Sequence, residues 1–130
     1  MHELSHELNR TGRSIIDSAF AVHTELGPGL LESIYEQCLI AELSDRGLSC
    51  RRQAAVPVIY KGRRLDAGLR LDLIVEEQVI VEIKAVEKLL PVHEAQVLTY
   101  LKLADLELGY LINFNVRLIK DGIRRLVRTQ

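Results

Sequence analysis

The sequence predicts a single α/β domain in which helices flank a mixed β-sheet. Apolar residues recur at helical spacing in the first third of the chain, and strand-like apolar runs follow in the middle. A further helix then separates these runs from one later buried strand, which must be reached by a crossover connection. The 130 residues, 48% hydrophobic and 27% charged, suit one core, so we expect one domain over residues 1–130.

Two helices are expected before the sheet. The first ends at Gly27-Pro28-Gly29, which breaks a helical apolar pattern made by Ile15, Ile16, Ala19, Val22 and Leu26. The second helix is expected from about Leu30 to Arg46, with Gly47 as its C-terminal cap.

A three-stranded meander is expected next. Ala54–Tyr60 alternates as a strand, and its Pro57 predicts an edge position. A tight turn at Lys61-Gly62 leads to the run 69–75, and the polar residues 76–78 lead to the run 79–86.

The last third of the chain predicts a helix and more strands. Pro91 opens a helix that runs to about Ala104, and residues 108–113 form the buried strand after the crossover. Asn115–Lys120 and Ile123–Arg128 flank Asp121-Gly122, which predicts a C-terminal hairpin at one side of the sheet.

The central hairpin concentrates charge. A turn centred on Glu77 sets Asp72 opposite Glu82, with Cβ atoms about 5 Å apart. Lys84 shares the face of Glu82, because side chains alternate with period two. Opposed carboxylates among apolar neighbours are destabilising, and a divalent cation held between them would offset that cost. An ordinary, partly buried salt-bridge cluster is the alternative interpretation.

This order of elements, with Asp72 in the second strand and Glu82-Ile83-Lys84 in the third, resembles the PD-(D/E)xK nuclease superfamily. The resemblance implies a restriction-endonuclease-like fold with an αβββαβ core, to which an N-terminal helix and a C-terminal hairpin are added. The segment Gly29–Tyr35 matches the motif that names the GxxExxY family within that superfamily. Nearly the whole chain is covered, since three later segments are also similar: Val81–Val86, Pro91–Tyr100 and Ile112–Phe114. Leu71 stands where the superfamily name has proline.

The resemblance implies a nuclease that hydrolyses phosphodiester bonds of DNA or RNA with Mg²⁺ or Mn²⁺. Asp72, Glu82 and the backbone carbonyl of Ile83 would hold the ion, with Glu32 as a further ligand. Lys84 would orient the attacking water or stabilise the developing negative charge.

Two side chains on the later helix are candidates for substrate binding. Gln96 and Tyr100 lie on one stripe, and their spacing resembles a motif associated with substrate DNA in the RecB-type exonuclease branch. A buried Gln–Tyr hydrogen bond that closes the sheet edge is an equal alternative. Glu32 has an alternative as well, as a first-turn glutamate stabilised by the helix dipole. Tyr35 is as compatible with core packing as with the site.

A net charge of -1 gives no overall attraction to a polyanion, so binding would need local basic groups. Candidates are Arg51, Arg52, Lys61, Arg63, Arg64, Arg124, Arg125 and Arg128, which would contact phosphates or else protect sheet edges. The rival function is a non-catalytic nucleic-acid-binding or protein-interaction module that keeps the fold. Neither a signal peptide nor a membrane-spanning run is evident, so we expect a cytoplasmic protein without membrane association. A requirement for a homodimer is left open.

Overall fold

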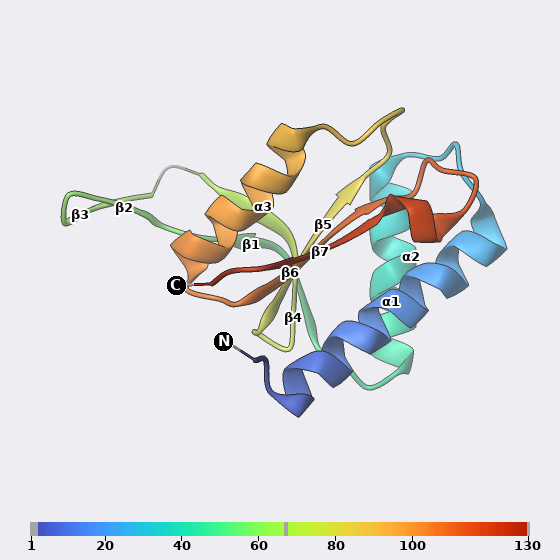
Figure 1. The fold of residues 1–130 in the computed structure, drawn as a ribbon, viewed down its shortest axis with the longest axis horizontal. Coiled ribbons are helices and arrows are strands. Elements are labelled where there is room, and N and C mark those ends of the chain that lie inside the picture. The colour runs from blue at the N-terminus through green and yellow to red at the C-terminus, as the bar shows by residue number, and fades with distance from the viewer. Residues whose placement is uncertain (1–2, 67, 130) are drawn as a thin grey trace.

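Helices cover both faces of a five-stranded sheet in the computed structural model, which describes residues 3–66 and 68–129 (Figure 1). The sheet order is β1-β4-β5-β6-β7, and β5 and β6 run parallel while the other neighbours are antiparallel. The predicted mixed α/β fold is therefore confirmed. In chain order the elements are α1 (His6–Leu26), α2 (Glu32–Asp45), β1 (Cys50–Ala55), β2 (Val58–Tyr60), β3 (Arg63–Leu65), β4 (Arg70–Val75), β5 (Val79–Lys84), α3 (Pro91–Ala104), β6 (Leu108–Asn113), the 3₁₀ turn η1 (Ile119–Gly122) and β7 (Ile123–Val127).

The two faces of the sheet carry separate apolar cores. Alternation along β5 sends Val81 and Ile83 toward the larger core beneath α1 and α2, and sends Ile80 toward the smaller core beneath α3. The helix α3 packs directly on β6, because a Cβ added at Gly109 would lie 2.9 Å from Val97 Cγ1. The charged face of β5 is thus the one that α3 covers.

Tyr35 ties the loop between α1 and α2 to the end of β6. Its ring is fully buried and stacks on Phe114, with centroids 4.6 Å apart and planes 7° from parallel. Its hydroxyl donates to the Gly27 carbonyl at 2.6 Å and accepts from the Leu30 amide at 3.1 Å. The structure therefore assigns Tyr35 to packing and to the anchoring of this loop.

The predicted strand Ala54–Tyr60 is wrong as a single element. The structure divides it at Pro57 into β1, an edge strand of the main sheet, and β2, which pairs with β3 in a small sheet of its own. The turn at Lys61-Gly62 joins β2 to β3 and does not lead directly into β4. Proline has no amide hydrogen to donate to a strand ladder, which explains the division.

The predicted strand Asn115–Lys120 is also wrong. Residues 115–118 form bends, η1 follows, and β7 pairs with β6. A Cβ added at Gly122 would overlap the Asn113 carbonyl, so the chain turns tightly against the end of β6 at this glycine. The C-terminal hairpin is therefore made by β6 and β7.

We predict that Tyr35→Phe destabilises the protein by about 1–3 kcal/mol, because the ring stack remains while the Leu30 amide and the Gly27 carbonyl lose their hydroxyl partner. Urea unfolding followed by circular dichroism measures the change. Tyr60→Phe is the matched control, since Tyr60 is 58% exposed and should change stability little. Equal stability of Tyr35→Phe and wild type would contradict the anchoring role.

Candidate functional site

The opposed carboxylates lie where β4 and β5 separate. The register pairs Leu73 with Val81, so the next pair is Asp72 with Glu82, as the turn position predicts. Here side chains replace ladder bonds: the Ile83 amide donates to Asp72 Oδ2 at 2.9 Å, and the Asp72 amide donates to Glu82 Oε1 at 3.3 Å. In Figure 1 the two strands leave a shared turn and then diverge, β4 toward β3 and β5 toward the loop before α3.

The sheet is irregular at Asp72. Leu71 packs into the core beneath α3, whereas Leu73 packs into the core beneath α1 and α2. Residues two apart on a regular strand share a face, so the backbone changes its facing between them. On β1, the residue across from Asp72 is Gln53, whose φ of 50° lies in the left-handed region. Both strands are therefore locally distorted beside the carboxylate pair.

The surroundings of Glu82 strongly perturb its side-chain carboxyl group. Its side chain lies in the sheet interior and the residue is only 4% exposed. Burial, and then the side-chain hydrogen bond and negative charge of Asp72, raise the pKa of Glu82 to about 9. The hydrogen bond from the Asp72 amide and the charge of Lys84 oppose this rise with smaller effects. At neutral pH Glu82 therefore keeps its proton in the metal-free protein.

Lys84 ends β5 on the same side of the strand as Glu82. Its carbonyl accepts from the Phe114 amide at 3.0 Å, and the following segment is clamped by Asn113. The Asn113 side chain accepts from the Val86 amide at 3.1 Å and donates to the Val86 carbonyl at 2.9 Å. Sequence reasoning missed Asn113. The sequence feature that could have indicated its role is a polar residue at the end of an apolar strand, because a buried polar side chain there needs hydrogen-bond partners.

Tyr100 approaches the carboxylates from α3. It is half-buried, and desolvation, followed by the negative charges of Glu82 and Asp72, raises the pKa of its hydroxyl. Gln96, one turn earlier, is exposed, and within residues 3–66 and 68–129 no hydrogen bond joins it to Tyr100. The structure therefore does not contain the alternative, a buried hydrogen bond between Gln96 and Tyr100.

The structure does not bring Glu32 together with the carboxylate pair as a third acidic group. Glu32 is exposed in the first turn of α2. In the described part of the chain, no group of three His, Cys, Asp or Glu side chains is arranged to hold a metal ion. The role of Glu32 as a further ligand stays a prediction.

The buried glutamate of α2 is Glu36. It is 6% exposed and forms an ion pair with Arg52, and it accepts from Gln53 Nε2 at 3.5 Å. Glu36 thus links α2 to the distorted part of β1. This contact gives Glu36 a structural role. The sequence alone shows only that Glu32 and Glu36 are two like charges one helical turn apart.

The candidate basic residues separate into two groups. Those along the main sheet mostly hold its margins: Arg51 binds Glu77 with two hydrogen bonds of 2.8 and 2.9 Å, and Arg128 binds Asp105 at 2.8 Å. Arg124 donates to backbone carbonyls. The second group lies on the β2–β3 hairpin, where all three side chains are exposed: Lys61, Arg63 and Arg64.

A sequence model described as the PD-(D/E)XK nuclease superfamily matches residues 9–126. The match includes both strands of the carboxylate pair and the helix that carries Tyr100. Searches of curated proteins and of solved structures found no significant match. None of the described helices is both long and apolar enough to cross a membrane.

We predict that the metal-free protein loses stability as the pH rises from 4.5 to about 9, the interval between the ordinary and the folded-state pKa of Glu82. In this interval the unfolded chain releases a proton that the folded protein retains, so deprotonation favours unfolding. Each pKa unit corresponds to about 1.4 kcal/mol, which makes the effect several kcal/mol.

Urea unfolding in EDTA across this pH range measures the loss. Glu82→Gln carries no ionisable group at this position, so its stability should depend less on pH than that of wild type and should exceed it near pH 9. Parallel pH profiles for the two proteins would refute the assignment of the titration to Glu82.

Proposed function

The chain belongs to the PD-(D/E)XK nuclease superfamily, and from this membership we propose that it is a metal-dependent nuclease acting on phosphodiester bonds of DNA or RNA. The observation that carries the proposal is the pairing of half-buried Asp72 with buried Glu82 where β4 and β5 separate, with Lys84 on the same face. The segment Gly29–Tyr35 supports a placement in the GxxExxY branch.

The donor atoms fit a hard divalent cation. Asp72 and Glu82 each engage one backbone amide through one oxygen, and each carboxyl group has a second oxygen. Mg²⁺ prefers oxygen ligands, is held by few carboxylates and keeps several waters, so the modest donor set suits Mg²⁺ or the similar Mn²⁺. The Ile83 carbonyl and Glu32 are the further ligands that we propose. When bound, the cation would lower the pKa of a water molecule and offset negative charge on the phosphate.

The remaining groups would act on the substrate directly. Lys84 is a compact cation at the edge of the pair, where it would orient the attacking water or stabilise charge that develops on the phosphate. Tyr100 keeps its proton, because its pKa is raised by burial and by the two carboxylates, and it can donate to a phosphate oxygen. Gln96 would extend this contact along α3. Asn113 would hold the segment after Lys84 in place.

A second candidate is a non-catalytic nucleic-acid-binding or protein-interaction module. Its support is that no third acidic side chain joins Asp72 and Glu82 in the described residues. The two functions differ in whether the pair binds a cation and whether Lys84 affects cleavage.

We predict that the protein binds Mn²⁺ with modest affinity. Glu82→Gln and Asp72→Asn should each abolish binding, because each substitution removes one of the two paired carboxylates that would hold the ion. Isothermal titration calorimetry of EDTA-dialysed protein with MnCl₂ gives the affinities, and circular dichroism confirms that the variants are folded. Glu25→Gln, an exposed carboxylate on α1, is the matched control and should bind as wild type does. Unchanged binding in Glu82→Gln would remove the proposed site.

We also predict that any nucleic-acid cleavage requires a divalent ion and falls by about 100-fold in Lys84→Ala, as expected when a group that stabilises transition-state charge is removed. Lys88→Ala removes an exposed lysine four residues later and, prepared identically, controls for contaminating nucleases. Equal cleavage by Lys84→Ala and wild type would reject the role of Lys84. If neither protein cleaves any substrate while both bind Mn²⁺, the non-catalytic module becomes the better interpretation.

A further inference from the structure

The β2–β3 hairpin forms a second exposed surface, separate from the carboxylate pair. Figure 1 shows it extending from the body of the molecule beyond the ends of β1 and β4. Its strands pair with each other in a sheet of their own. Three large apolar side chains are exposed on it: Ile59 by 57%, Tyr60 by 58% and Leu65 by 44%. Exposed apolar side chains gathered on a projecting ribbon point to a partner that covers them.

Charge on this hairpin opposes the charge of the rest of the chain. Residues 57–70 contain four basic side chains and one acidic side chain, which gives a local charge of +3. Because the whole chain carries -1, the remaining residues together carry -4. The acidic residue, Asp66, pairs with Arg64 at 3.3 Å, but both side chains are exposed and such surface pairs are weak. The partner that this charge complements is a polyanion.

Each face of the hairpin sets an apolar group beside a cation. The register pairs Tyr60 with Arg63 and Ile59 with Arg64, and alternation sends the two pairs to opposite faces. Lys61 adds a third cation, with its Nζ 5.5 Å from the centroid of the Tyr60 ring. Basic groups that flank apolar ones match a nucleic-acid groove, where phosphates border the base edges.

We propose that the β2–β3 hairpin is an arm that enters the major groove of duplex DNA and holds the duplex beside the carboxylate pair. The major groove of B-DNA admits a two-stranded ribbon, whereas that of A-form RNA is deep and narrow. Strands of three residues span about 10 Å, which is comparable to the groove depth. β4 follows the arm in the chain, and its Arg70 lies two positions before Asp72, so a duplex held by the arm would be delivered to the pair. The inference rests on the proposed nuclease function and names its substrate class.

The test is DNA binding by the triple variant Lys61→Gln, Arg63→Gln and Arg64→Gln. Fluorescence anisotropy with a labelled duplex DNA oligonucleotide is measured in EDTA, so that neither metal nor cleavage contributes. We expect binding at least tenfold weaker than that of wild type. A plot of log affinity against log salt concentration should also have a slope smaller in magnitude by up to about 2.7, because three cations that contact phosphates are removed. Tyr60→Ala should weaken duplex binding without changing this slope.

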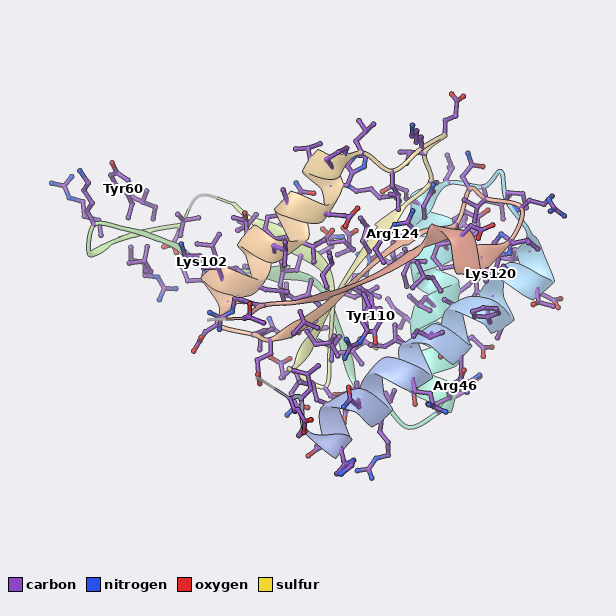
Figure 2. The ribbon with its side chains drawn as sticks, in the orientation of Figure 1. Arg46, Tyr60, Lys102, Tyr110, Lys120 and Arg124 are labelled. Atoms are coloured by element: carbon purple, nitrogen blue, oxygen red, sulfur yellow. The ribbon has the colours of Figure 1, made fainter. Side chains whose placement is uncertain are left out.

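The matched control removes three exposed arginines distant from the hairpin in sequence, two on α1 and one at the C-cap of α2, by Arg10→Gln, Arg13→Gln and Arg46→Gln. Figure 2 shows Arg46 far from Tyr60, which lies toward the outer end of the hairpin. The control should bind duplex DNA as wild type does.

Three results would overturn the proposal: equal losses in the control and the hairpin variant, tighter binding of wild type to single-stranded DNA or duplex RNA than to duplex DNA, or a wild-type dimer that Tyr60→Ala dissociates. Loss of Mn²⁺ binding or cleavage does not enter these measurements. A failure of the nuclease proposal is thus distinguishable from a failure of the arm.

Discussion

The opposition of Asp72 and Glu82 across two diverging strands is the constraint around which the rest of the site is arranged. The two carboxyl groups repel when both are charged, and the burial of Glu82 disfavours its charged form further. The protein accommodates them by retaining a proton on Glu82 and by using one oxygen of each group to bind the neighbouring backbone. Such an arrangement costs stability at neutral pH, and the cation site that we propose would account for that cost.

Several buried contacts hold the frame around this pair. Asn113 clamps the segment that follows Lys84, and Tyr35 locks the helix loop against the end of β6. Glu36 and Arg52 connect α2 to the distorted part of β1. Because these contacts lie on different elements, they fix the surroundings of the pair at several separate points. A rigid frame of this kind keeps polar groups in position without relying on mobile loops.

The distribution of basic residues reconciles a near-neutral chain with the polyanionic substrate that we propose. Arginines at the margins of the main sheet are largely engaged by acidic side chains or carbonyl groups, so they contribute to the fold. The cations of the β2–β3 hairpin remain exposed, and their one acidic neighbour, Asp66, makes only an exposed surface pair with Arg64. Binding strength for nucleic acid depends on such local phosphate contacts and much less on net charge.

The local pattern of the sequence was sufficient for the mixed sheet, the bounds of α3 and β6, and the pairing of Asp72 with Glu82, because alternation and turn position are local and fix which residues oppose each other. It was insufficient at Pro57, because the residues after the proline could extend an edge strand or form a separate hairpin, and the choice depends on which other segments are available for strand pairing. Only the tertiary structure showed that Glu36 is buried and Glu32 exposed, and that Asn113 clamps the site, because burial and long-range hydrogen bonds depend on elements distant in the chain.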